Sequence, residues 1–295
     1  MSLSKRTTRP LDHVVLPVAD LSRARRRLND LGFTVADDAR HPFGTENACV
    51  FFSDNTYLEP LAVASREECE AAALAGNVFV ARDQAFRFRQ GPEGLSAVVL
   101  GTPDAASDHM RFRASGVSAG DMLEFSRPMR LPDGREGLGS FRLAFAADLR
   151  APDFFLFSCQ RIRALPVDGA TLHKHENGVL GIAEVVLSEQ NPTDFQYLLQ
   201  EGIDEREVAA HSFGMDIQAG GVKLSVLNPA GMEAFFGRSV SDAERGLRGR
   251  AVVFRVTDLE ATRALFAHGI EFAEMGGRLI VPEAPGQGVI FAFGV

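Results

Sequence analysis

A histidine in the middle of a predicted strand is the first residue that could do chemistry. The segment LDHVVLPV, residues 11–18, has the apolar period of two that is typical of a strand, and His13 interrupts it. Because strand side chains alternate between faces, His13 shares a face with Val15, whereas Val14 and Leu16 point the other way. We expect Val14 and Leu16 to pack beneath a helix, which leaves His13 facing a site. The alternative is a core imidazole with a satisfied partner.

A carboxylate interrupts a second strand-like segment, TYLEPLAV, at residues 56–63. Glu59 shares a face with Tyr57 and Leu61. Burying a carboxylate among apolar neighbours is unfavourable unless it is paired or bound to a metal ion. Glu59 is therefore predicted to have a specific partner.

Further polar candidates lie in loops and on later strands. In HPFGTEN, residues 41–47, His41 is either a site residue or a loop histidine, and Thr45 and Asn47 flank a predicted turn that could hold a substrate oxygen. Arg127 and Arg142 lie on predicted strands, where each could bind a carboxylate or carbonyl-rich ligand or face solvent. The pair His173 and His175 has a metal-like spacing, but its position in a linker favours solvated loop residues.

The composition bounds the class of protein. The chain has 295 residues, of which 45% are hydrophobic and 24% charged, which suggests about two domains. It has no apolar run long enough for a membrane helix and no secretory signal at its start, so we expect a cytoplasmic protein without a membrane partner. The net charge of −8 argues against nucleic acid. The three cysteines, without CxxC spacing, are expected to be buried free thiols.

One structural unit recurs four times along the chain. Each copy opens with a valine-rich strand, at Leu11, Leu95, Ile182 and Gly249. Each then has an Asp or Asn that can cap a helix, at Asp20, Asp104, Asn191 and Asp258. Each helix is predicted to end at a glycine, at Gly32, Gly116, Gly202 and Gly269. About three shorter strands follow, so the sequence predicts an α+β chain of four βαβββ units. Residues 66–88 predict a connecting helix, and residues 161–181 a linker.

This repeated unit resembles the vicinal oxygen chelate superfamily, which includes glyoxalase I, bleomycin-resistance proteins and extradiol dioxygenases. Residues 11–161 are similar to its glyoxalase-like domain group. The motifs that carry the resemblance are LDHVVLPVADL, GFTV at 32–35, HPFGTEN, TYLEPLAV and PDFFLF at 152–157. The resemblance implies that two units pair into an open, eight-stranded cup. Four units would then form two cup domains, over residues 8–165 and 178–295.

The resemblance also implies a divalent metal ion in the first cup. His13 matches the ligand position on the first strand of the unit and Glu59 the position on its fourth strand. They would hold Zn, Mn, Fe, Ni or Mg, and Glu59 could double as the catalytic base. The expected substrate-binding residues are His41, Thr45, Asn47, Tyr57 and Arg142.

The other units depart from this ligand pattern. The position of His13 is taken by Ala97, Glu184 and Ala251, and residues 154–157 offer no ligand on the last strand of unit two. Because zinc normally needs three protein ligands, a third donor is required. The candidates are His41, His175 and Glu184. Glu184 either marks a second, degenerate pocket or forms a salt bridge with Lys223 or an arginine, and we favour the salt bridge.

The functional expectation is a glyoxalase-like protein that binds a small, oxygen-rich metabolite in a cup. As an enzyme it would be a metal-dependent lyase, isomerase or dioxygenase. The alternative is a binding or sequestration protein of the bleomycin-resistance type, without turnover. The second pair of units could serve in a homodimer contact.

Overall fold

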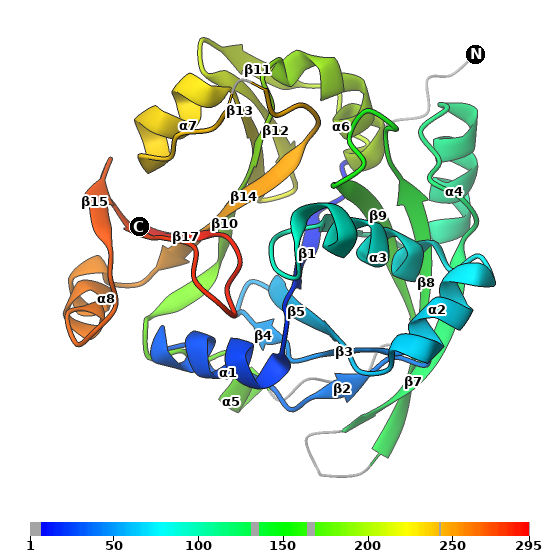
Figure 1. Cartoon of the computed structure of the whole chain (residues 1–295), viewed down its shortest axis with the longest axis horizontal. Helices are drawn as coiled ribbons and strands as arrows, with labels where there is room; N and C mark the ends of the chain where they lie inside the picture. The colour runs from blue at the N-terminus through cyan, green and yellow to red at the C-terminus, as the bar shows by residue number, and fades with distance from the viewer. Residues whose placement is uncertain (1–6, 131–135, 164–168, 242, 295) are drawn as a thin grey trace.

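The computed structural model describes residues 7–130, 136–163, 169–241 and 243–294, which form two curved sheets (Figure 1). The first unit contains β1 (Leu11–Pro17), α1 (Leu21–Asp30), β2 (Ala39–Arg40), β3 (Thr45–Asn47), β4 (Val50–Phe51) and β5 (Tyr57–Val63). The second unit contains β6 (Ala97–Gly101), α4 (Ala105–Ala114), β7 (Leu123–Arg130), β8 (Glu136–Ala146) and β9 (Phe155–Arg163). Together they make a nine-stranded sheet in the order β2-β3-β5-β1-β6-β9-β8-β7, with β4 also paired to β5.

The second sheet repeats this plan. The third unit contains β10 (Val179–Ser188), the 3₁₀ helix η1 (Pro192–Phe195), α6 (Gln196–Ile203), β11 (Val208–His211), β12 (Gly214–Ala219) and β13 (Val222–Leu227). The fourth contains β14 (Arg248–Val256), α8 (Leu259–Phe266), β15 (Ala273–Met275), β16 (Arg278–Val281) and β17 (Ile290–Gly294). Helix α5 (Gly169–Leu172) precedes this half, and α7 (Pro229–Phe236) joins its two units. The strand order is β11-β12-β13-β10-β14-β17-β16-β15, so the predicted α+β fold of four βαβββ units is confirmed.

The first sheet ends at β9 and the second begins at β10, with α5 between them. The predicted end of the first domain, residue 165, lies outside the described residues.

The helix starts follow the capping pattern, with one exception. The side chains of Asp20, Asp104 and Asp258 each accept a hydrogen bond from a backbone N–H in the first turn of the following helix. Asn191 makes no such bond, and a 3₁₀ turn beginning with Pro192 follows it. In the same unit α6 runs through the glycine predicted to end it and stops at a residue in the left-handed conformation, Asp204, whose φ is 60°.

The strand β1 has two differently buried faces, as its alternation predicts. Val14 and Leu16 belong to a large apolar cluster that also contains Leu28 of α1. The same cluster includes residues of the second sheet, such as Val185 on β10. Val15 belongs to a separate cluster on the inner face of the first sheet. Because His13 was expected to share a face with Val15, the inner face is the face on which it was expected.

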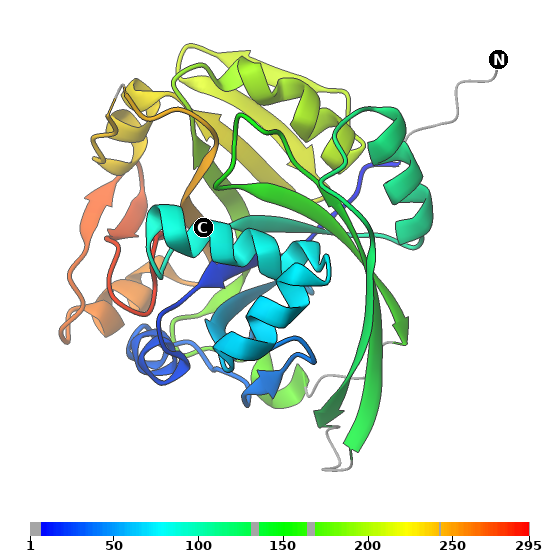
Figure 2. The same ribbon diagram turned by 45° about the vertical axis from the view of Figure 1, so that its right-hand side comes forward.

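A pair of helices covers the inner face of the first sheet. The sequence predicts one connecting helix here, but the structure has two, α2 (Arg66–Leu74) and α3 (Val78–Gln90), and Asn77 caps the second. Cys69, Phe79 and Val80 of this pair pack in the same cluster as Val15. Figure 2 shows both helices lying across the strands of the first sheet. The first cup is consequently roofed rather than open.

The sequence also predicted free, buried cysteines and no membrane-spanning helix. All three cysteines, Cys49, Cys69 and Cys159, are buried and unpaired, as predicted. Within the described ranges, no helix combines the length and the apolar character needed to cross a bilayer.

Candidate functional site

His13 and Glu59 meet on the inner face of the first sheet. Strands β1 and β5 run parallel, with Val15 opposite Glu59 and His13 opposite Tyr57. This register places the Nε2 atom of His13 3.2 Å from Oε2 of Glu59, and both side chains are buried. The two residues that interrupted apolar segments of the sequence are thus partners of each other.

Asp12 holds the other nitrogen of the His13 ring. Its Oδ1 lies 2.6 Å from Nδ1 of His13, and Arg161 of β9 donates to the same carboxylate from Nη2 at 2.8 Å. Strict alternation would put Asp12 and His13 on opposite faces. However, the pairing of β1 with β6 is irregular between Leu11 and His13, and such a bulge allows neighbouring side chains to converge. Strand alternation therefore did not indicate Asp12, and Arg161 was missed because it fell at the start of the predicted linker.

His41 approaches Glu59 from the loop before β3. Its Nε2 lies 3.7 Å from Oε1 of Glu59, and its Nδ1 is 2.9 Å from Oγ1 of Thr45. His13 and His41 therefore have the same arrangement. In each ring Nδ1 is held by a neighbouring oxygen, while Nε2 faces the one carboxylate.

Asn47 connects this carboxylate to an arginine. Its side-chain amide donates to Oε1 of Glu59 at 2.5 Å, and its oxygen accepts a hydrogen bond from Nη1 of Arg127 at 3.3 Å. Arg127 lies on β7, in the unit that offers no ligand at the expected positions, and its Nε has no hydrogen-bond partner. The second unit thus contributes a cation to the site.

Burial and hydrogen bonds set the charges of these groups. Desolvation alone would raise the pKa of Glu59, but the hydrogen bond from His13 and the nearby positive charges outweigh it and lower the pKa to about 2. Asp12 behaves in the same way, with a pKa of about 2. Burial lowers the pKa of His41 to about 4, so its ring is neutral near pH 7. For His13 the bonds to Asp12 and Glu59 outweigh desolvation and raise the pKa.

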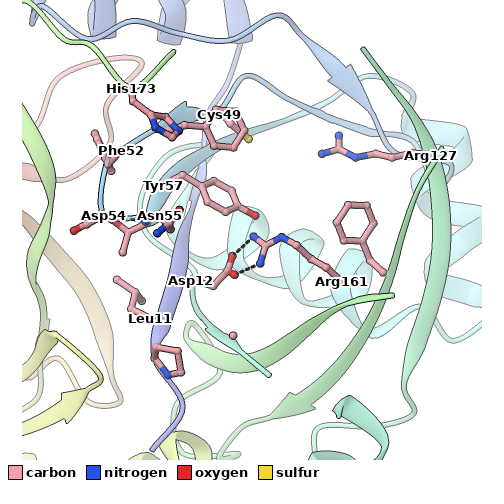
Figure 3. Close-up of a pocket in the computed structure, with 15 residues that line it drawn as sticks. Leu11, Asp12, Cys49, Phe52, Asp54, Asn55, Tyr57, Arg127, Arg161 and His173 are labelled. Carbon is pink, nitrogen blue, oxygen red and sulfur yellow. Dashed lines mark hydrogen bonds and ion pairs between the residues drawn. The ribbon is translucent and has the colours of Figure 1, made fainter. Parts of the chain in front are cut away.

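Aromatic side chains wall this polar centre. The ring of Tyr57 stacks on His13 with centroids 4.2 Å apart, and Phe43 stacks on His41 at 5.0 Å. The histidines and Glu59 border a cavity of only about 40 Å³, which Phe79 of the helical roof helps to close. A larger cavity of about 680 Å³ adjoins it, since Tyr57 and Arg127 border both (Figure 3).

Several other predicted residues lie elsewhere. Arg142 forms a cross-strand ion pair with Glu124, with 2.7 Å between Nη2 and Oε2. His175 accepts a hydrogen bond from the Thr34 N–H at 3.0 Å, and its Nε2 lies 3.0 Å from the carbonyl oxygen of Phe51. These contacts tie the linker to the first unit. His173, by contrast, borders the larger cavity.

The matching position in the second sheet is filled by ion pairs, as favoured for Glu184. Its carboxylate lies 3.1 Å from Nζ of Lys223 and 2.9 Å from Nη2 of Arg278. It also accepts a hydrogen bond from Ser225 at 2.7 Å. Because Val186 pairs with Ser225 as Val15 pairs with Glu59, Ser225 occupies the position of Glu59 in this sheet.

The donor types in the first cup fit a divalent metal ion. Two imidazole Nε2 atoms face one carboxylate, and each ring is oriented by a second hydrogen bond, as metal-binding histidines usually are. The three side chains contact each other directly instead of converging on a point. Accordingly, no group of three or more His, Cys, Asp or Glu side chains among the described residues has the arrangement of a metal site.

Comparisons with known proteins place this geometry in context. The family model of the glyoxalase-like domain matches residues 11–203. A hypothetical protein from Staphylococcus aureus has a similar structure, with 12% identity, a TM-score of 0.66, and coverage of 96% of this chain and 98% of that one. No curated protein matches the chain.

Two similar structures belong to named enzymes. The Mn(II)-bound glyoxalase from Novosphingobium aromaticivorans shares 10% identity, with a TM-score of 0.53 over 98% of this chain and 82% of that one. The structure of 2,2′,3-trihydroxybiphenyl 1,2-dioxygenase from Sphingomonas wittichii shares 10% identity, with a TM-score of 0.54 over 98% of this chain and 91% of that one. At these identities the likeness concerns the fold.

Proposed function

Because the chain belongs to the glyoxalase-like domain family, within the vicinal oxygen chelate superfamily, we propose that its first cup is the active site of a metal-dependent enzyme for a small, oxygen-rich metabolite. His13, His41 and Glu59 would hold the metal ion. The observation that carries this proposal is the shared orientation of the two histidines toward one buried carboxylate.

The surroundings of the three donors support metal binding. The bonds of Asp12 and Thr45 to the Nδ1 atoms leave both Nε2 atoms directed at Glu59. Two imidazoles and a carboxylate form a common donor set for catalytic divalent metals. The Mn(II)-bound glyoxalase shares this fold, which is consistent with a metal here.

A metal ion bound at these donors would act as a Lewis acid toward the oxygens of the ligand. The chain itself supplies the rest of the chemistry. Asn47 orients the carboxylate of Glu59, and the stacked ring of Tyr57 limits the access of water to His13. Glu59 is the carboxylate that could accept a proton from the ligand if its bond to the metal ion loosens. This arrangement suits a lyase, an isomerase or a dioxygenase.

Metal analysis of the purified protein tests the proposal. We expect about one equivalent of divalent metal in the wild type and loss of most of it in His13→Ala and Glu59→Gln, because a three-donor site tolerates no missing ligand. His211→Ala is the matched control. His211 begins the segment HSFG of unit three, which is similar to the segment HPFG that begins at His41 in unit one. A wild type that takes up no metal on titration, or metal retained in both site variants, would contradict the proposal.

One observation favours a second candidate, a binding protein without turnover. Among the described residues no three donors converge, and the second unit presents Ala97 and two phenylalanines where further ligands are expected. A protein that binds an organic ligand tightly when free of metal, and does not change it, would establish this alternative.

A further inference from the structure

Arg127 is a buried cation without an anionic partner. The residue is 9% exposed, and its Nη1 donates to the neutral side-chain oxygen of Asn47. Its Nε makes no hydrogen bond, and no carboxylate of the described residues lies within 4 Å. Two other arginines of the same half differ, because Arg161 pairs with Asp12 and Arg142 with Glu124.

A buried guanidinium without an anionic partner destabilises the folded protein. Desolvation of a charge is unfavourable unless an opposite charge or several hydrogen bonds compensate it. The ring of Phe141, whose centroid lies 5.9 Å from the Arg127 guanidinium carbon, compensates only in part. The position of Arg127 therefore indicates that an anion belongs beside it.

The cavity next to Arg127 has room for such a ligand. It measures about 680 Å³, within the usual range for small-molecule sites, and Figure 3 shows the Arg127 side chain directed into it. Phe51, Phe52 and Tyr57 give it aromatic walls.

The other charges of this cavity are already balanced. Asp12 pairs with Arg161, and Asp54 pairs with Arg255 at 3.0 Å. Arg127 thus remains the one charged side chain of this cavity without a direct ion pair among the described residues, and Asn47 separates it from the carboxylate of Glu59.

Building on the proposed function of this cup, we propose that Arg127 anchors the negatively charged group of an aromatic or otherwise apolar ligand. The anionic group, a carboxylate or a phosphate, pairs with the guanidinium fork, which matches the geometry of both. The body of the ligand lies against the aromatic walls of the larger cavity. Since Arg127 borders both cavities, the anchored ligand lies next to the histidines and Glu59.

Binding of simple probes tests this assignment. Benzoate and phenyl phosphate carry the two anionic groups, and benzamide is the neutral analogue of benzoate. Calorimetry and thermal shift are measured on protein treated with a chelator. We expect at least one anion to bind and to raise the melting temperature, with benzamide about tenfold weaker or worse. Arg127→Met should abolish this preference, whereas Arg127→Lys should retain part of it. Arg142→Met, which removes a paired cation of the same unit, should bind like the wild type.

Other results of the same measurements would overturn the assignment of Arg127. The assignment is overturned if neither anion binds, if benzamide binds as well as benzoate, or if Arg127→Met binds the anions as the wild type does. Binding that requires added Mn²⁺ would also overturn it, because the metal would then be the anchor, while the proposed metal site would stand. Binding that needs Arg127 in a protein unable to take up metal supports this inference and contradicts the metal proposal.

Discussion

The carboxylate of Asp12 contacts both the ring of His13 and the guanidinium of Arg161. The ion pair that Asp12 forms with Arg161 at the cavity wall therefore also helps to orient His13. The carboxylate is buried, whereas part of the Arg161 side chain is exposed. The orientation of His13 therefore depends on a residue that sequence alternation assigns to the opposite face.

Asp12→Asn should weaken metal binding without removing a metal ligand. An asparagine keeps the shape but loses the charge that orients the ring, and outer partners of this kind typically contribute about 10–100-fold to metal affinity. Titration with Mn²⁺ or Zn²⁺ measures the change, with Asp38→Asn, in an exposed pair with Arg25, as the control. An unchanged affinity would show that Asp12 has no influence on the site.

Glu184→Gln should affect stability alone, in contrast to Glu59→Gln. Removing the charge leaves Lys223 and Arg278 without their buried partner, at a cost of about 2 kcal/mol in the free energy of unfolding. Urea denaturation measures this cost. The metal content of Glu184→Gln should equal that of the wild type. A loss of metal in this variant would mean that the second cup also binds.

Phe79→Ala should open the roof of the small cavity. Phe79 is 4% exposed and packs against His41 and Phe157, so its truncation should lower the free energy of unfolding by about 3 kcal/mol. Phe88→Ala is the control on the same helix, because Phe88 is 93% exposed. Denaturation gives the stabilities, and xenon or benzene binding reports the enlarged cavity. Equal stability of the two variants would contradict the role of α3 as a roof.

His175 should make the fold sensitive to mild acid. Burial lowers its pKa below 6.5, and its neutral ring accepts the hydrogen bond from Thr34 N–H. The unfolded chain therefore binds a proton first, and stability is lost as the pH falls below 6.5 toward the lowered value. In His175→Gln this loss should be smaller as the pH falls below 6.5, and His268→Gln, which removes an exposed imidazole, should behave like the wild type. Denaturation at each pH is the measurement, and parallel curves would count against the prediction.

The sequence predicted the parts of the fold that depend on local pattern. Valine-rich strands, Asp caps and a recurring spacing define the four units, and all four are present. Alternation along β1 and β5 predicted which face His13 and Glu59 each occupy, whereas the expectation that the two meet came from the resemblance, which places them at matching ligand positions.

Other features depend on contacts between distant segments, which alternation does not encode. Asp12 reaches His13 through an irregularity in strand pairing, and Arg127 reaches Asn47 from a strand 80 residues away. Nothing in the composition of residues 66–88 indicated that they would cover the cup. Arg142, like Arg127, lies on a predicted strand and was expected to face either the cup or solvent. Its ion pair with Glu124 on the facing strand holds it away from the site.

The apolar cluster that joins both sheets implies a single cooperative unfolding transition. Val14 and Leu28 from the first half belong to the same cluster as Val185 and Phe254 from the second. Neither half can expose this surface without losing much of its own core, so the halves should melt together, with coincident transitions by different probes. The second half, whose own cup is filled by ion pairs, would then be retained as the partner without which the first half cannot stay folded.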